Sequence, residues 1–403
     1  MIPILGLSPD KVIYCGDTRT LKTEKHRRFI RHGVGVLSPG TVIDFLPLNP
    51  CNVDGVCQEL GNLNAGRALS EIVIDLTGGE SLIVFALGKL AERNNITAVV
   101  YRPGKHVLLC VNGNLKKTEF TFHRQPTIAQ MISVVGGSYL RCGHGNLKNI
   151  EHLLHPYIIP VFHLLKSDAA LWRQFTAYFQ QASKNHYRRG DMWSAPMLLM
   201  SGDRVTLCPP QVFQLLRNIG MLRELAINVH TCRFRLQHPG FRSVLSDFGI
   251  WLELYVTQIM KRSQLFDCVE TSVVVCWNED QGENGDVENE IDIVASRGIG
   301  QLFVSCKTSQ PDVHALNELK TISNRFGSKY AVPLLVTLQD LRKRPSALLE
   351  RAAQMGVEVI CGDELEEEVC VKRLATISRR WGSVLGTVYP TPSDNVYSKS
   401  NDE

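Results

Sequence analysis

The chain has 403 residues, which is long for one hydrophobic core and predicts two or three domains. With 44% hydrophobic and 21% charged residues it has the composition of a globular protein, and it holds no uncharged apolar run long enough to cross a membrane. The N-terminus lacks the pattern of a secretory signal, so we expect a soluble, cytoplasmic protein. The net charge of +4 permits nucleic-acid binding but does not indicate it.

The 12 cysteines are scattered and include no Cys-x-x-Cys pair. Several lie within apolar runs, as Cys276 and Cys306 do, which is typical of reduced core residues and not of a disulfide framework or a zinc site. A further group of cysteine and histidine residues also lacks the spacing of zinc ligands, so the sequence does not predict a zinc site there. Its members are Cys142, His144, His152, His155 and His163.

Residues 1–125 alternate strand-like with helix-like segments, a pattern that predicts a Rossmann-like parallel sheet covered by helices on both faces. A hairpin at 106–111 and 116–122 closes this part, with Asn112-Gly113-Asn114 as its turn. The expected strands are 12–15, 42–48, 72–76 and 96–101, and the expected helices are 19–32, 53–69 and 80–93.

Residues 126–240 form a middle region with a mainly helical pattern. Apolar periodicity predicts helices at 150–165, 171–182 and 211–225. Two short strand-like runs, 205–207 and 231–236, would pair to complete a winged-helix-like insert.

Residues 241–390 are predicted to form a third domain, and the tail at 391–403, rich in Pro, Ser, Asn and Asp, is predicted to be disordered. The order helix, three strands, helix, strand is that of restriction-endonuclease-like α/β cores. The expected elements are a helix at 244–262, a strand at 269–277, a hairpin at 290–307, a helix at 312–326, a strand at 331–338, a helix at 346–355 and a strand at 357–361.

The hairpin is the most informative segment of the chain. Side chains two apart share one face of a strand, so Glu290 and Asp292 point to one side, and so do Ser305 and Lys307. Pairing then gathers two carboxylates and an ammonium, which suits Mg²⁺- or Mn²⁺-dependent phosphodiester hydrolysis. The alternative is a surface hairpin with ordinary exposed charges. The side chains expected in the core are those of Ile291, Ile293, Val304 and Cys306.

A third carboxylate, Glu253, lies on the helix before the first of these strands. It stands beside an apolar stripe at helical spacing that packs the helix on the sheet, and Gly249 one turn earlier leaves room around it. Glu253 is thus either a residue of the metal site or a partly exposed helical acid. The stripe consists of Val244, Phe248, Trp251, Leu252, Tyr255 and Ile259.

Glu-Ile-Asp at 290–292, Cys-Lys-Thr at 306–308, Trp-Leu-Glu at 251–253 and Ala-Leu-x-Glu-Leu at 315–319 resemble a known nuclease. It is the C-terminal nuclease of CRISPR-associated effectors that join a CARF domain to a PD-(D/E)xK nuclease, and the resemblance covers essentially the whole chain. It implies that Mn²⁺ or Mg²⁺ is held by acidic side chains and a main-chain carbonyl, and that Lys307 orients the attacking water. The implied ligands are Asp292, Glu290, Glu253 and the carbonyl of Cys306.

The strand at 72–76 and the Thr77-Gly78-Gly79 that follows are similar to the CARF strand and loop that contact a cyclic oligoadenylate. A strand running into this loop and then a helix presents backbone N–H groups to a phosphate, and glycines permit close approach. A plain strand-to-helix turn is the alternative. Asp17 and Thr18, at the end of an earlier strand, form a second candidate contact.

The resemblance implies a homodimer whose CARF domains share one cyclic tetra-adenylate and whose nuclease domains then cut DNA or RNA in type III CRISPR antiviral defence. Three departures bear on this. Ser305 stands where the family carries Glu, Glu80-Ser81 replaces Thr-Lys after the glycines, and the family's first strand is expected to be missing before Met1. Two further hypotheses therefore stay open. One is a weakened or inactive sensor or scaffold, and the other is a nucleic-acid-binding regulator that uses the middle helical region and basic faces at 342–344 and 379–380.

Overall fold

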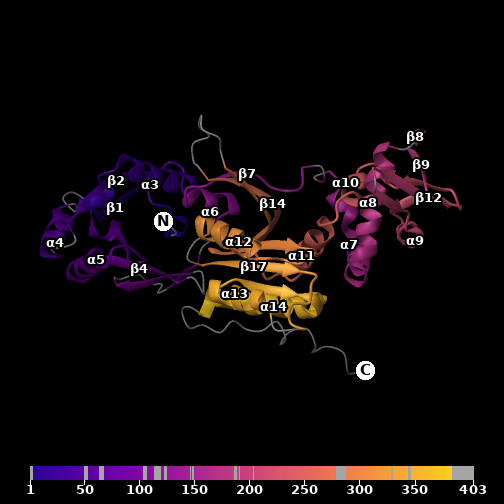
Figure 1. Cartoon of the computed structure of the whole chain (residues 1–403). Helices are drawn as coiled ribbons and strands as arrows, with labels where there is room; N and C mark the ends of the chain where they lie inside the picture. Colours follow the sequence, from indigo (N-terminus) through magenta and orange to yellow (C-terminus); the bar gives the residue numbers. More distant parts are fainter. Residues whose placement is uncertain are drawn as a thin grey trace, which may run out of the picture.

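The computed structural model has a mixed α/β fold in three parts that follow one another along the molecule (Figure 1). An N-terminal part lies at one end, a large sheet with its helices lies in the centre, and the part built on α7 to α9 lies at the other end. None of the helices described has both the length and the apolar character needed to cross a membrane. The residues described are 3–49, 53–62, 68–102, 107–112, 119–121, 125–145, 147, 149–185, 188–189, 191–202, 204–277, 287–327, 330–343 and 346–383.

The N-terminal part alternates strands and helices as predicted, but it forms two sheets where one is expected. β1 (Lys11–Asp17) pairs in parallel with β2 (Val42–Leu48), while β3 (Val73–Asp75) pairs in parallel with β4 (Thr97–Arg102). Among the described residues no strand links β1 to β3, which is why the sheet is divided. The other elements are α1 (Pro3–Leu7), α2 (Thr18–Leu21), α3 (Glu24–Leu37), α4 (Val53–Asn62), a 3₁₀ turn (Leu69–Glu71), α5 (Ser81–Arg93), β5 (Val107–Asn112) and β6 (Glu119–Thr121).

Several boundaries in this part differ from the predicted ones. The helix expected at 19–32 is two helices, α2 and α3, divided at Lys22 and Thr23. The predicted hairpin is confirmed in the antiparallel pairing of β5 and β6, although its turn at 113–118 lies outside the described residues. The cluster that holds the two sheets together includes Leu48, Ile74 and Ala98, covered by α4 and α5.

The middle region contains more strand than the sequence predicts. The expected helices are present as α7 (Glu151–Ser167) and α8 (Ala169–Asn185), but the helix expected at 211–225 ends at Asn218. Gly220, with φ of +87°, reverses the chain there, and β12 follows. The strands and the third helix are β8 (Arg188–Arg189), β9 (Met192–Pro196), β10 (Leu198–Ser201), β11 (Arg204–Leu207), α9 (Pro210–Asn218), β12 (Leu222–Ile227) and β13 (Thr231–Leu236).

The strand pairing expected of a winged-helix-like insert is wrong. β11 pairs with β10, while β13 pairs with β12 and β9 in a four-stranded sheet. Aromatic side chains of α8, including Phe175 and Phe179, pack between this sheet and Phe213 of α9. Burial of these rings fixes the sheet on the helices, a long-range effect that local periodicity does not reveal.

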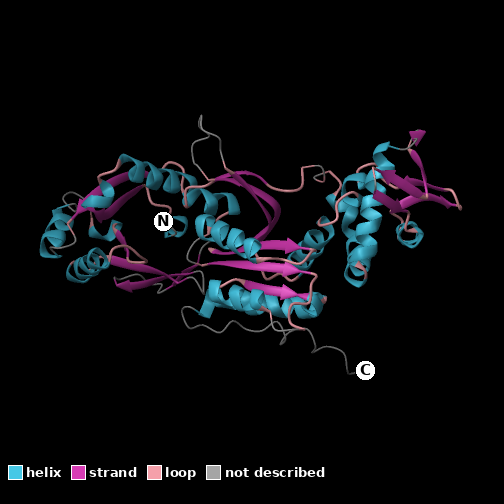
Figure 2. Cartoon of the chain, in the orientation of Figure 1, coloured by secondary structure: helices cyan, strands magenta, loops and turns pink. Residues whose placement is uncertain are grey.

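The central sheet has the strand order β18-β17-β16-β15-β14-β7 and confirms the predicted order of helices and strands (Figure 2). The helix expected at 244–262, however, is two helices, α10 (Phe241–Leu245) and α11 (Ile250–Arg262), interrupted at 246–249. β7 (Ser138–Arg141) joins it from the segment assigned above to the middle region, and α14 (Glu367–Ser383) was not predicted at all. The remaining elements are α6 (Ile128–Val134), α10 (Phe241–Leu245), α11 (Ile250–Arg262), β14 (Cys268–Cys276), β15 (Glu288–Arg297), β16 (Gly300–Lys307), α12 (Val313–Phe326), β17 (Ala331–Thr337), α13 (Ala347–Met355), β18 (Glu358–Cys361) and a 3₁₀ turn (Gly362–Leu365).

Helices cover both faces of this sheet, with α11 and α14 on one side and α12 and α13 on the other. The four hairpin residues predicted to be buried are all buried, but they do not share one core. Ile293 lies in the cluster under α11, whereas Ile291 lies in the cluster under α12. The change of face coincides with an irregular backbone in the neighbouring strand, where Ser272 has φ of +47°.

Candidate functional site

The β15–β16 pair brings Asp292 beside Ser305, as strand parity predicts. Asp292 Oδ2 accepts a 2.6 Å hydrogen bond from the backbone amide of Cys306 and a 3.3 Å hydrogen bond from Ser305 Oγ. Burial raises the pKa of Asp292, whereas these two hydrogen bonds and the nearby Lys307 ammonium oppose that shift. The carboxylate is therefore fixed in place by the strand that carries Lys307.

Glu290 lies on the same strand as Asp292, two residues earlier. The Ser272 hydroxyl of β14 donates a short hydrogen bond to Glu290 Oε1. Ser272, whose backbone is left-handed, thus holds Glu290, the second carboxylate of the site, through its side chain. Lys307, at the end of β16, is half-buried and acts electrostatically on both Asp292 and Glu253.

Glu253 lies in the first turn of α11, between neighbours that are buried. Its side chain is only 18% exposed, so it faces the site and is not an ordinary surface acid. Burial raises the pKa of Glu253 to about 8, and the carboxylates of Asp292, Asp247 and Glu290 add to the shift, while Lys307 opposes it. In the absence of a cation, Glu253 is therefore largely protonated at neutral pH.

His144, in the loop after β7, is a site residue that sequence reasoning missed. Its Nε2 lies 3.5 Å from Glu253 Oε2, and this buried nitrogen has no hydrogen-bond partner among the described residues. Burial lowers the pKa of His144 in spite of the surrounding carboxylates of Glu290 and Asp292, so the ring is neutral near pH 7. The spacing of His and Cys along the sequence could not reveal His144 as a site residue, because the carboxylates around it lie on other elements, α11 and β15.

The side chains at this site fit a divalent cation in their chemistry. Three carboxylates offer oxygen donors, and the orphaned His144 nitrogen is a further neutral donor aimed at Glu253. These donor atoms do not surround a common point as they stand, because no three His, Cys, Asp or Glu residues in the described ranges are grouped tightly enough to hold a metal. Binding of a cation would therefore require side-chain movement. The structure shows Cys306 as an amide donor to Asp292, and a ligand role for its carbonyl stays a prediction.

The loop after β3 has the shape expected of a loop whose backbone a ligand approaches closely. A side chain at Gly78 would meet no other atom within 4 Å, and Gly79 has φ of +143°, which favours glycine. Thr77 is engaged within the fold, since its amide donates to Asp75 Oδ1 and its hydroxyl accepts from the Tyr101 amide at 2.9 Å. The open position of this loop is thus Gly78, since a Cβ atom at Gly79 would lie 3.3 Å from Val84 Cγ2.

Glu80 meets the positive end of α5 with its own carboxylate, which accepts a 3.0 Å hydrogen bond from the Ile83 amide. Asp17 similarly caps α2 by accepting from the Arg19 amide at 2.7 Å, and the Thr18 hydroxyl donates to the Leu48 carbonyl at 3.0 Å. Both helix starts near the predicted ligand loops therefore already hold a carboxylate of this chain.

Comparison with known proteins finds likeness in structure alone. No family model matches the chain, and no curated protein matches it. The protein VC1899 from Vibrio cholerae has a similar structure, with a TM-score of 0.68 at 17% identity over 94% of each chain. Can2 from Sulfobacillus thermosulfidooxidans, solved in complex with cyclic tetra-adenylate, has a TM-score of 0.60 at 15% identity over 94% of this chain and 93% of its own. At these identities the likeness shows the fold alone, which the chain shares with both proteins over 94% of its length.

Proposed function

We propose that this protein is a cyclic-oligoadenylate-responsive, metal-dependent nuclease of type III CRISPR antiviral defence. The observation that carries the proposal is the gathering of Asp292, Glu290, Glu253 and Lys307 where the central strands β15 and β16 meet α11. The chain that presents them has the fold of Can2, a protein solved in complex with cyclic tetra-adenylate, over nearly its full length.

The proposed chemistry is hydrolysis of a phosphodiester bond in DNA or RNA. Mn²⁺ or Mg²⁺, when bound, would supply Lewis-acid stabilisation of the phosphoryl oxygen and lower the pKa of water. Glu253, Asp292 and Glu290 would hold the cation, with His144 as a neutral donor that compensates for the missing acid at Ser305. Lys307 would orient the attacking water and stabilise charge on the phosphate in the transition state.

The proposed regulation places cyclic tetra-adenylate at the loop of Thr77, Gly78 and Gly79, with Asp17 and Thr18 as a second contact. The open space at Gly78 supports close approach of a ligand to the backbone. A two-fold ligand suits a two-fold homodimer, and the ligand activates only if it binds the active arrangement more tightly than the idle one.

Ser305 favours a second candidate, a sensor or scaffold whose nuclease is weakened or inactive. A hydroxyl is a poorer ligand for a hard cation than a carboxylate, and here it donates to Asp292. For the regulator hypothesis the two basic faces differ, because Arg342 pairs with Glu364 at 3.1 Å and Lys343 with Asp340 at 3.0 Å, whereas Arg379 of α14 is exposed. Arg344 lies outside the described residues.

The test is a cleavage assay with Mn²⁺ on single-stranded DNA, single-stranded RNA and supercoiled plasmid, with and without cyclic tetra-adenylate. We expect ligand-dependent cleavage that Lys307→Ala reduces by about a hundredfold or more. Lys320→Ala, on α12 and half-buried like Lys307, is the matched control. Absence of cleavage with ligand would favour the inactive sensor, and cleavage that survives Lys307→Ala would overturn the proposed mechanism.

A further inference from the structure

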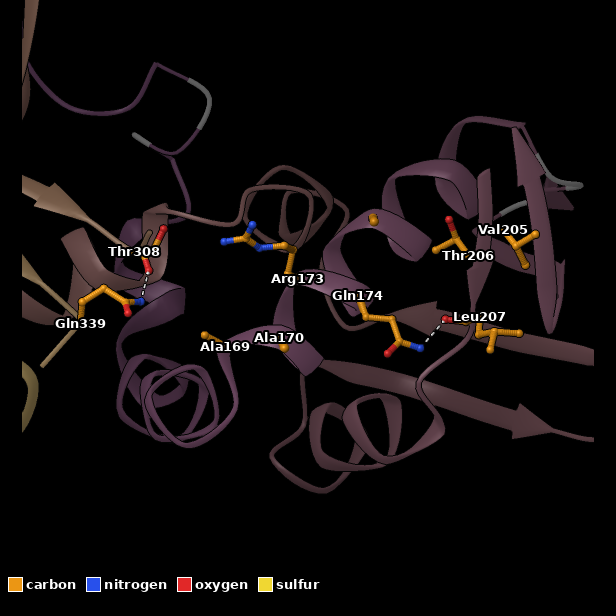
Figure 3. Close-up of a pocket in the computed structure, with 10 residues that line it drawn as sticks. Ala169, Ala170, Arg173, Gln174, Val205, Thr206, Leu207, Thr308 and Gln339 are labelled. Atoms are coloured by element: carbon orange, nitrogen blue, oxygen red, sulfur yellow. Dashed lines mark hydrogen bonds between the residues drawn. The ribbon is translucent and has the colours of Figure 1, made fainter. Parts of the chain in front are cut away.

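A cleft opens where the middle region meets the segments that follow β16 and β17 of the central sheet (Figure 3). Its volume is about 650 Å³. One wall is formed by Thr308 and Gln339, and the opposite wall by α8 and the end of β11. Thr308 follows Lys307 directly in the chain, so the cleft begins at the residue next to the one that carries the proposed catalytic ammonium, about 3.8 Å away between Cα atoms.

Arg173 gives the cleft a positive charge. Figure 3 shows its side chain reaching from α8 toward Thr308. Its guanidinium lies 4.7 Å from the centre of the Phe248 ring, which precedes the helix of Glu253. A cation–π contact of this kind orients the group while leaving its N–H donors available, and within the described ranges no carboxylate forms an ion pair with Arg173.

The other lining residues suit a polymer with a polar backbone and flat apolar bases. Two glutamines supply amide groups: Gln174 donates to the Leu207 carbonyl and Gln339 to the Thr308 carbonyl. Val205 and Leu207 line the far wall and are more than half exposed, at 55% and 53%. The floor is built from small side chains that leave room for a chain to lie along α8, namely Ala169, Ala170 and Ala177.

We propose that this cleft is the path by which a single strand of nucleic acid reaches Lys307, with Arg173 binding a backbone phosphate and Val205 and Leu207 contacting bases. The inference rests on the proposed nuclease function and adds to it a binding site and a strand preference. A cavity of about 650 Å³ is in the size range of small-ligand sites, so it holds one or two nucleotides of a single strand and not a duplex.

The experiment measures binding apart from cleavage. Fluorescence anisotropy follows fluorescein-labelled single-stranded DNA, single-stranded RNA and a duplex of the same sequence with the full-length protein in EDTA, so that hydrolysis cannot consume the probe. Each titration is repeated with saturating cyclic tetra-adenylate and at several salt concentrations. The variants are Arg173→Gln, Arg173→Lys and Gln339→Ala, and the matched control is Arg223→Gln, which removes the same charge from exposed β12.

We expect Arg173→Gln to weaken single-strand binding about tenfold and to reduce its salt slope by about 0.7, as loss of one phosphate contact requires. Arg173→Lys should recover part of the affinity, Gln339→Ala should weaken binding from the opposite wall, and Arg223→Gln should change little. The better-bound single strand then identifies the substrate. Equal effects of Arg173→Gln and Arg223→Gln, or binding of the duplex as tight as that of the single strands, would overturn the proposal.

These outcomes are separable from failure of the proposed function. If wild-type protein cleaves in the presence of Mn²⁺ while Arg173→Gln binds normally, the nuclease stands and the cleft proposal fails. If binding depends on Arg173 but no substrate is cut, the cleft stands and the nuclease proposal fails. Thermal melting of each variant verifies folding, which we expect to be unchanged for the Arg173 and Arg223 variants because both residues are exposed, whereas Gln339 is half-buried and its variant depends on this check.

Discussion

Ser305 Oγ donates a 3.3 Å hydrogen bond to Asp292 Oδ2, so the residue that differs from the nuclease pattern this chain resembles is bonded directly to the central acid of the candidate site. The same oxygen also accepts from the Cys306 amide at 2.6 Å. In this environment a carboxylate at position 305 would face Asp292 instead of donating to it. The substitution therefore stabilises the cation-free site at the expense of a ligand for the cation.

Ser305→Glu should reverse that balance. Two carboxylates in contact repel, so we expect the free energy of unfolding without metal to fall by about 1 to 3 kcal/mol. With Mn²⁺ present, the added oxygen ligand should raise metal affinity about tenfold or more and increase ligand-dependent cleavage. Chemical denaturation in EDTA and calorimetric titration with Mn²⁺ measure the two effects.

Ser305→Gln is the control for size, because it adds the same volume without the charge. It should leave Mn²⁺ affinity near that of the wild type. If the Glu and Gln variants bind Mn²⁺ equally, then position 305 does not contact the cation, and the weakened-enzyme hypothesis loses its physical basis.

Glu253 predicts a pH dependence of both stability and metal binding. Its folded-state pKa of about 8 exceeds the ordinary value of 4.5, so the folded protein binds more protons than the unfolded chain between these values. Without metal, stability should therefore fall as pH rises from about 4.5 to about 8, by an amount on the order of a few kcal/mol. Mn²⁺ affinity should rise across the upper part of that range, because the cation needs the ionised carboxylate.

Glu253→Gln isolates this effect, since the amide keeps the shape and cannot titrate. Unfolding midpoints in EDTA and Mn²⁺ titrations at a series of pH values should show flatter profiles for the variant. Parallel profiles for wild type and variant would mean that another group controls the dependence.

His144 predicts a metal preference. Imidazole nitrogen suits Mn²⁺ and Co²⁺ better than Mg²⁺, so His144→Ala should weaken Mn²⁺ binding about tenfold and leave Mg²⁺ binding nearly unchanged. In the Co²⁺ protein the visible absorption should shift with loss of a nitrogen ligand. His155→Ala, on the exposed face of α7, is the control. Equal losses for Mn²⁺ and Mg²⁺ would instead assign His144 a structural role beside Glu253.

Local sequence pattern predicted most of the central sheet, because each of its strands and helices has a clear apolar periodicity. The prediction failed where packing between distant segments determines the secondary structure. Residues 222–227 continue an apolar period, yet Gly220 ends the helix and pairing with β13 makes them a strand. The division of the N-terminal sheet likewise depends on which strands pair with one another. The sequence of a single segment does not determine that pairing.

The candidate site shows the same limit. Pairing of the hairpin correctly placed Asp292 beside Ser305, since that relation is local to two paired strands. Parity alone was not sufficient, because Ile291 and Ile293 face opposite sides of the sheet. His144 could not be found in this way, because β7 joins the sheet from a segment some hundred residues before its neighbour β14. Nor does the sequence show that the Glu80 carboxylate turns back on α5, which decides what a ligand meets at that loop.

Glu80 should therefore control the affinity for cyclic tetra-adenylate. Its carboxylate accepts a 3.0 Å hydrogen bond from the Ile83 amide and places negative charge beside the loop proposed to bind an anion. Glu80→Thr keeps an oxygen that can cap α5 and removes the charge, so we expect tighter ligand binding, by about threefold to tenfold, with stability nearly unchanged.

Glu80→Ala separates the two effects, because it removes both the charge and the cap. It should cost about 1 kcal/mol of stability while still improving affinity over the wild type. Calorimetric titration with cyclic tetra-adenylate at low and high salt measures the change, and the advantage of Glu80→Thr should shrink at high salt, where charge repulsion is screened. If removal of the Glu80 charge weakens binding instead, its carboxylate contacts the ligand directly, as an acceptor for a ribose hydroxyl or an adenine amino group.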